Sequence, residues 1–167
     1  MSDITYVKVG EQYYYVCVIL DLFSRRVLSY RISDTIDTSL SLSTFEDAFH
    51  FRKPENLIFH SDRGKQYTSA AFTKLFQANG VKQSFSATAR PIDNAVAESF
   101  FGSFKKEEAY RREYTSEQNF CKSVEQYIRF YNEVRPHQTL KYRTPLAVED
   151  KFYSRFIENE CSNSVRE

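Results

Sequence analysis

Three carboxylates occupy positions in the chain from which they could hold a divalent metal ion for phosphoryl chemistry. Asp3 lies in the first expected strand, Asp62 directly follows a short expected strand, and Glu98 lies in a long expected helix. Open α/β sheets place ligands beyond the carboxyl ends of their strands, which is where Asp62 stands. Carboxylates that converge from separate elements repel one another unless a cation lies between them, and Mg²⁺ prefers oxygen ligands. The three residues therefore predict a metal site.

Such a site has a specific chemical use. Two divalent ions about 3.5–4 Å apart can stabilise both the attacking and the leaving oxygen of an in-line phosphoryl displacement. Taken singly, each carboxylate also has an ordinary explanation. Asp62 suits a turn at a strand end, and Glu98 is one of 22 acidic residues that would be expected on a solvated helix surface.

Other titratable residues compete for these roles. Asp21 follows the second expected strand and is interpreted as a hairpin-turn residue, and Asp93 as a cap near the start of the Glu98 helix. His60, beside Asp62, is expected to form hydrogen bonds rather than to bind metal, because these ions prefer oxygen. His137 is interpreted as a turn histidine, with a role near the metal or in nucleic-acid binding as the alternative.

The elements that must position these residues follow from periodicity. The expected order is β-β-β-α-β-α-β-α-α, which predicts a single α/β layer sandwich with helices on the faces of a mixed sheet. The first three strands form an antiparallel meander, and the middle one is apolar enough to be covered on both faces. The expected boundaries are strands within residues 3–32, a helix over 38–51, a strand over 55–62, a helix from Ser69 to Asn79-Gly80, a weak strand over 81–85, a long helix from Pro91 to about Arg112, and a helix from a Thr115–Gln118 capping box to Val134.

Composition indicates one folded domain. The 167 residues are 41% hydrophobic and 16% aromatic, which excludes a disordered chain. A net charge of +1 is not the strong positive balance of many nucleic-acid binders, so any DNA contact must come from local patches. The longest apolar run, residues 13–20, is too short to span a bilayer. We expect a soluble cytoplasmic protein whose three cysteines are free thiols, with no membrane partner.

Several segments together resemble a known family. The motifs are HSDRGKQYTS, the 35 intervening residues 63–97, and DNAVAESFFGSFKKE, together with DITYV, DLFSRRVLSY and YIRFYNEVRPHQTLKYRTPLAVE. They are similar to the catalytic core of bacterial insertion-sequence transposases, which have the ribonuclease H-like fold of retroviral integrases. The resemblance covers residues 3 to about 152. It implies an integrase-like core over residues 1–152 and leaves residues 153–167 as a tail that we expect to be frayed.

The resemblance also implies a set of site residues. Asp3, Asp62 and Glu98 match the family's Asp-Asp-Glu metal ligands, which implies two Mg²⁺ ions, with Mn²⁺ as a substitute. The fold that it implies is a ribonuclease H-like mixed sheet, with a three-stranded antiparallel meander plus parallel strands and helices on both faces.

Four further residues are expected to contact DNA. Lys105 matches a basic residue that the family places seven positions after its glutamate, and seven residues are close to two helical turns. Asn94, one turn before Glu98, would face the same way. Lys106 and Arg63 are expected to contact phosphates.

The implied activity is that of a DNA transposase, a two-metal polynucleotidyl transferase that nicks transposon ends and joins them to target DNA. Its partners would be these DNAs and further copies of itself, at the bacterial nucleoid. Relatives usually carry a DNA-binding region before the core, whereas this chain begins two residues before Asp3. An N-terminally truncated, inactive remnant that multimerises with full-length transposase is therefore an alternative. A ribonuclease H-like hydrolase of RNA is another.

Overall fold

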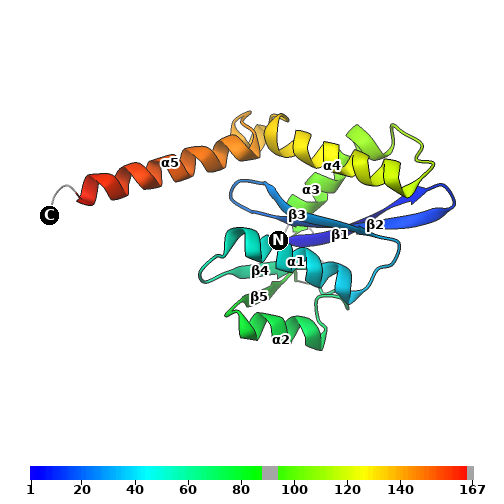
Figure 1. Ribbon diagram of the computed structural model, residues 1–167, viewed down its shortest axis with the longest axis horizontal. Helices are drawn as coiled ribbons and strands as arrows, with labels where there is room; N and C mark the ends of the chain where they lie inside the picture. Colours follow the sequence, from blue (N-terminus) through cyan, green and yellow to red (C-terminus); the bar gives the residue numbers. More distant parts are fainter. Residues whose placement is uncertain (88–93, 165–167) are drawn as a thin grey trace.

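The chain folds into five strands and five α-helices over its described residues (Figure 1). The structure is a computed structural model that describes residues 1–87 and 94–164, with side chains described through residue 155. The elements are β1 (Ser2–Val9), β2 (Gln12–Leu20), β3 (Val27–Ser33), α1 (Thr38–Arg52), β4 (Ile58–Ser61), α2 (Ala70–Ala78), β5 (Lys82–Phe85), α3 (Ala95–Phe104), a π-helical turn η2 (Lys105–Ala109), α4 (Glu117–Glu133), a 3-10 turn η3 (Gln138–Leu140) and α5 (Pro145–Ser164). The expected order of strands and helices is confirmed, with α5 added at the end.

The strands form two hydrogen-bonded sheets. β1, β2 and β3 form the antiparallel meander in that order, and Tyr6 lies opposite Tyr15 in the register. The turn between β1 and β2 contains Gly10 at φ 58°, a left-handed conformation that glycine adopts without a steric penalty. β4 and β5 pair in parallel, with Ile58 opposite Lys82. In the described part of the chain the pairing does not continue from β1 to β4, so the mixed set of strands is divided between two sheets.

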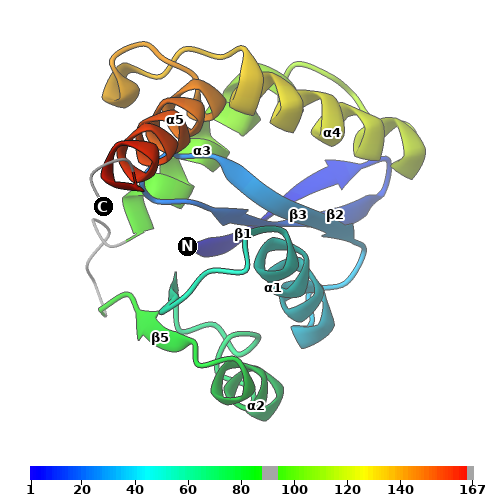
Figure 2. The ribbon, with the colours of Figure 1, turned by 60° about the vertical axis from the view of Figure 1, so that its left-hand side comes forward.

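Helices cover both faces of the meander, as expected. Figure 2 shows α3 and α4 on one face and α1 on the other. β2 is buried on both sides because Val16, Val18 and Leu20 pack into the cluster of α3 and α4, whereas Ile19 packs with Phe45 of α1. A strand enclosed in this way buries nearly all of its apolar surface, which explains its unbroken run of hydrophobic residues.

The observed N-terminal caps of the helices agree in part with the predicted ones. The hydroxyl of Ser69 accepts a hydrogen bond from the Phe72 amide and caps α2, as predicted. The cap of α4 is Ser116, which accepts from the Asn119 amide, so the prediction of a Thr115–Gln118 box was wrong by one residue. Both hydroxyl residues have the chemistry of a cap, and only the path of the backbone decides between them.

The helix that carries Glu98 is shorter than expected. α3 begins at Ala95, and the turn η2 continues it to Ala109 before the predicted end at Arg112. The expected start at Pro91 lies outside the described residues.

The end of the described chain forms a helix, α5, that was not among the elements expected from the sequence. α5 continues to Ser164 and extends well beyond the rest of the molecule (Figure 1). No glycine or proline follows Pro145, so the backbone chemistry supplies no helix breaker there. None of the helices in the described residues has the length and hydropathy that crossing a bilayer requires.

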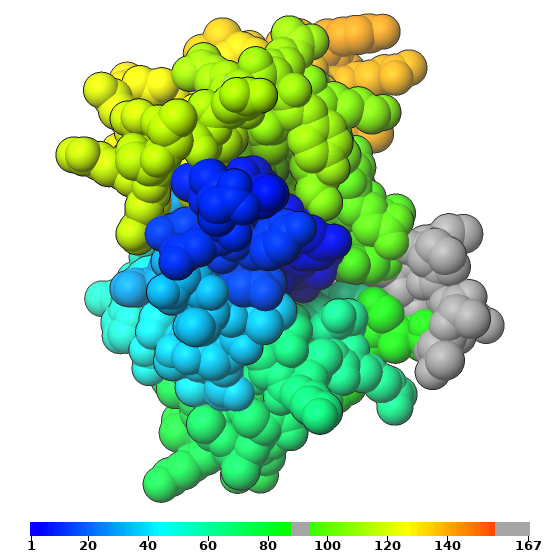
Figure 3. All heavy atoms as spheres, turned by 90° about the vertical axis from the view of Figure 1, so that its right-hand side faces the viewer, coloured from blue at the N-terminus to red at the C-terminus, as the bar shows by residue number. Residues whose placement is uncertain are grey.

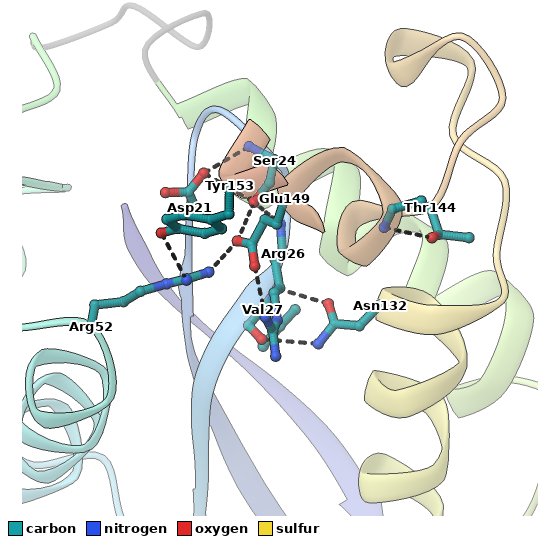
Figure 4. Close-up of polar contacts among 10 residues, drawn as sticks. Asp21, Ser24, Arg26, Val27, Arg52, Asn132, Thr144, Glu149 and Tyr153 are labelled. Carbon is teal, nitrogen blue, oxygen red and sulfur yellow. Dashed lines mark hydrogen bonds and ion pairs between the residues drawn. The ribbon is translucent and has the colours of Figure 1, made fainter. Parts of the chain in front are cut away.

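A buried carboxylate holds the beginning of α5 against the body of the protein. Glu149 is 5% exposed and accepts hydrogen bonds from the Ser24 hydroxyl at 2.8 Å and from the Arg26 guanidinium at 2.6 Å. It also pairs with Arg52, at the end of α1 (Figure 4). One side chain of α5 therefore binds both the turn between β2 and β3 and the last turn of α1.

Candidate active site

Asp3 is held by hydrogen bonds from two directions. Its Oδ1 atom accepts from the Ile4 backbone N–H at 2.8 Å, and its Oδ2 atom accepts from the Asn94 side-chain amide at 3.1 Å. Asn94 is the residue that precedes α3, so this contact joins the first strand to the start of the helix that carries Glu98. Asn94 had been expected to contact DNA. In the structure it contacts one of the proposed metal ligands.

Asp62 directly follows β4, at the strand end where the sequence placed it. Its Oδ1 atom accepts a hydrogen bond from the Gly64 backbone N–H at 2.9 Å, which is the geometry of an Asx-turn. The side chain is half-buried. The turn fixes one carboxylate oxygen of Asp62, much as the Ile4 amide fixes one oxygen of Asp3.

The three carboxylates share one electrostatic environment. Burial raises the pKa of Asp3 above its ordinary value, and the negative charges of Asp62 and Glu98 raise it further. The hydrogen bonds from Ile4 and Asn94 act in the opposite direction. β1 lies against both β4 and α3, so the fold brings the strand of Asp3, the end of β4 and the first turn of α3 to one region.

The carboxylates do not form a compact ligand set as they stand. Within residues 1–87 and 94–164, no group of three or more His, Cys, Asp and Glu side chains is close enough to hold a metal ion. Glu98 is exposed, whereas Asp3 and Asp62 are half-buried. In Figure 3 the first strand (dark blue) lies between the green surface of α3 and the teal-green surface of the segment after β4, which places the three elements at one surface.

The basic residues lie beside these elements. Lys105 directly follows α3, and its ammonium lies 5.6 Å from the centre of the Tyr6 ring on β1. Lys106 is exposed. Arg63 is also exposed, and its guanidinium lies 5.8 Å from the centre of the Phe85 ring. All three positions are compatible with phosphate contact, which stays a prediction.

The competing residues have structural roles. Both ring nitrogens of His60 form hydrogen bonds, Nδ1 with Ser84 at 3.0 Å and Nε2 with Ser86 at 3.1 Å, so the interpretation of His60 as a hydrogen-bonding residue is confirmed. Asp21 accepts from the amide of Ser24 at 2.7 Å and is a turn residue, as predicted. Asp93 lies outside the described residues.

His137 is a structural histidine, as its position in a turn suggested. It is 7% exposed, and its Nε2 atom lies 3.2 Å from the carbonyl oxygen of Tyr131. Burial lowers the pKa of His137 below its ordinary value, with a smaller contribution from the charge of Arg135. Its ring therefore resists protonation in the folded state.

This histidine should make the protein less stable in mild acid. The unfolded chain takes up a proton near pH 6.5, before the folded chain does, so the free energy of unfolding falls as the pH falls below that value. We expect urea denaturation to show a larger loss between about pH 7.5 and about pH 5.5 for the natural protein than for His137→Asn. Equal losses in both proteins would show that His137 does not cause the pH dependence.

Ser2, Tyr67 and Glu149 were not identified from the sequence as important. Tyr67 is completely buried although it lies in the polar segment HSDRGKQYTS. It is the one aromatic residue of that segment, and this was the only sequence feature that could have indicated its burial. Glu149 lies near the start of α5, after three apolar residues and before the charged residues Asp150 and Lys151. No sequence pattern distinguishes it from an exposed helix residue.

Sequence comparisons find bacterial transposases. The chain is 29% identical over 154 residues to the transposase for insertion sequence element IS629 of Shigella sonnei, covering 92% of this chain and 52% of that protein. It is 32% identical to the putative transposase InsK for IS150 of Escherichia coli, covering 92% and 54%. It is 34% identical to the transposase InsF for IS3A of the same species, covering 90% and 53%. The chain spans about half the length of these curated relatives.

Structural comparisons find retroviral integrases. The catalytic core domain of HTLV-2 integrase, solved in complex with magnesium in a trimeric form, superposes with a TM-score of 0.69 at 17% identity, covering 88% of this chain and 92% of that one. A simian T-cell lymphotropic virus intasome in complex with PP2A regulatory subunit B56 gamma gives 0.74 at 18% identity, covering 88% and 52%. These likenesses confirm the ribonuclease H-like fold.

Two family models, both described as integrase core domains, match overlapping parts of the chain. One matches residues 1–91 and the other residues 79–145. The first alone covers more than half of the 167 residues and includes β1, β4 and both aspartates. The second includes α3 and Glu98. The chain therefore belongs to the integrase core domain family.

Proposed function

We propose that this chain is the catalytic domain of a DNA transposase that cuts and joins DNA strands with the help of divalent metal ions. One observation carries the proposal: β1, which contains Asp3, lies against both β4, which Asp62 follows, and α3, which contains Glu98, and Asn94 at the start of α3 donates a hydrogen bond to Asp3. Relatives that are named transposases support the choice of DNA as substrate.

The donor set fits a hard divalent cation. Asp3, Asp62 and Glu98 would supply only carboxylate oxygens, which Mg²⁺ and Mn²⁺ prefer. The repulsion that raises the pKa of Asp3 would become attraction to a shared cation. When two ions are bound, they supply charge stabilisation to the attacking and leaving oxygens of the phosphodiester.

The residues of the chain would orient the reactants around this site. Backbone amides already fix one oxygen of Asp3 and one of Asp62, and Asn94 holds the second oxygen of Asp3. In the first reaction a water oxygen would form a new P–O bond while the P–O3′ bond of the phosphodiester breaks, and the departing 3′-oxygen would gain a proton in exchange for the one that the water loses, which leaves a 3′-OH at the transposon end. In the second, that hydroxyl attacks a target phosphodiester in the same way. Lys105, with Lys106 and Arg63, would hold the DNA phosphates.

We place the catalytic core at residues 1–152 and expect the active assembly to contain several copies of the protein, working at the bacterial nucleoid. Because all three carboxylates are present, we favour an enzyme over a non-catalytic remnant. The transposase relatives favour DNA over RNA as the substrate.

Metal binding gives a direct test of the site. A ligand at 100 times its dissociation constant stabilises a protein by about 2.7 kcal/mol, so saturating Mn²⁺ should raise the unfolding temperature by several degrees. We expect this shift to disappear in Asp62→Asn and in Asp3→Asn. Glu133→Gln, which changes an exposed carboxylate on α4, should keep it. An equal Mn²⁺ shift in Asp62→Asn would exclude the proposed ligand set.

A further inference from the structure

A buried pair of hydroxyl groups joins the elements that carry the two aspartates. The Tyr67 hydroxyl lies 2.8 Å from the Ser2 hydroxyl, and the two side chains are 0% and 1% exposed. The Ser2 hydroxyl donates its own proton to the carbonyl oxygen of Val18 at 3.0 Å. Because a serine hydroxyl has one proton, Tyr67 must be the donor in the contact with Ser2. Burial raises the pKa of Tyr67 well above its ordinary value, which keeps that proton in place.

At one end of this contact, a chain of hydrogen bonds leads from Tyr67 to Asp62. The Tyr67 backbone N–H donates to the carbonyl oxygen of Gly64 at 2.9 Å, and the Gly64 N–H donates to the Asp62 carboxylate at 2.9 Å. On its other side, the carbonyl oxygen of Tyr67 accepts from the Gln83 side chain of β5 at 2.7 Å. Tyr67 therefore fixes the loop that shapes the Asp62 turn.

At the other end, Ser2 immediately precedes Asp3 on β1. Successive residues of a strand point to opposite faces, so Ser2 points toward Tyr67 while Asp3 points toward Asn94 and α3. β1 and β4 are not paired in a sheet. Within the described ranges, the Ser2–Tyr67 contact is the hydrogen bond that connects β1 with residues 58–68.

The ring of Tyr67 is held independently of its hydroxyl. It packs against Phe72 with ring centres 5.6 Å apart and against Phe59 at 6.1 Å. Removing the hydroxyl alone should therefore leave the aromatic packing in place. The effect of the Ser2–Tyr67 hydrogen bond can therefore be measured without disturbing the packing of the hydrophobic core.

We propose that the Ser2–Tyr67 hydroxyl pair sets the position of the Asp62 loop relative to Asp3, which makes Tyr67 a positioning residue for the metal site. The role of Tyr67 at the metal site rests on the proposed function. The hydrogen bond between Ser2 and Tyr67 does not depend on it. Partners that orient metal ligands typically change metal affinity by 10–100-fold when they are removed. The Tyr67 hydroxyl acts one step further from the ligand, so we expect the lower end of that range.

The test compares Tyr67→Phe, Ser2→Ala and the double variant with the natural chain. Amide hydrogen exchange at residues 64, 67 and 68, measured without metal, should accelerate several-fold in each variant, while α4 keeps its protection. The Mn²⁺ dissociation constant should rise by about tenfold. The double variant should lose no more than Ser2→Ala alone, because Ser2→Ala already removes the contact that Tyr67→Phe removes, together with the hydrogen bond to Val18. Tyr14→Phe is the matched control: it removes a tyrosine hydroxyl that donates to Glu117, away from the site.

Several results would overturn the inference. These are unchanged exchange at residues 64–68 in Tyr67→Phe, the same acceleration there in Tyr14→Phe, losses that multiply in the double variant, or faster exchange with unchanged Mn²⁺ affinity. A natural chain that binds no Mn²⁺ would instead count against the proposed function. In that case the exchange measurements would still decide whether the hydroxyl pair holds the loop.

Discussion

Asp62→Asn should abolish DNA strand cleavage and strand transfer, lowering the rate by at least about 10³-fold. Charge stabilisation by metal ions contributes several kcal/mol to phosphoryl transfer, and each 1.36 kcal/mol changes the rate tenfold. Asparagine can still accept the hydrogen bond from the Gly64 amide, so the turn after β4 should persist. The substitution thus removes the charge and little else. The measurement is product formation from labelled insertion-sequence ends by the protein, with Mg²⁺ or Mn²⁺.

Asp150→Asn provides the control for this experiment. Asp150 is an exposed carboxylate on α5, outside the region that Asp3, Asp62 and Glu98 share, and its loss should leave the rate within about twofold of the natural protein. Strand transfer by Asp62→Asn at the natural rate would refute the site assignment. Absence of any metal-dependent product from the natural, folded protein would refute the proposed reaction itself.

Glu149→Gln should destabilise the fold by about 3 kcal/mol, the lower end of the cost of breaking a buried ion pair. The substitution keeps the shape of the side chain but leaves Arg26 and Arg52, which are 24% and 20% exposed, without their common counter-charge. For a chain of this length the loss corresponds to a fall of about 6 to 12 °C in the unfolding temperature. Chemical and thermal denaturation would measure it.

Two comparisons separate this effect from a general sensitivity to lost charge. Glu133→Gln removes the exposed pair with Arg129 and should cost at most about 1 kcal/mol. Replacing Glu149, Arg26 and Arg52 together with methionine should recover much of the loss, because no buried charge then lacks a partner. If Glu149→Gln were no more destabilising than Glu133→Gln, the ion pairs of Glu149 with Arg26 and Arg52 would not be what holds α5 against the rest of the protein.

The strands and helices were largely predictable because periodicity and turn chemistry are local. The unbroken apolar run of β2 indicated a strand covered on both faces, and the clusters of α1 and of α3–α4 supply those covers. Local signals failed where two neighbours had the same chemistry, as with Thr115 and Ser116 at the start of α4. They also missed the last helix, α5, which begins at Pro145.

The sequence by itself indicated the family and predicted Asp3, Asp62 and Glu98 as a metal site, because residue types and the spacing between Asp62 and Glu98 are linear properties. Only the tertiary structure decided that Asp3 shares an electrostatic environment with Asp62 and Glu98, and that Asn94 binds Asp3. It alone revealed Tyr67 and Glu149, which bind partners 65 and as many as 125 positions away along the chain. Such contacts depend on how separate elements pack, and no local pattern records that packing.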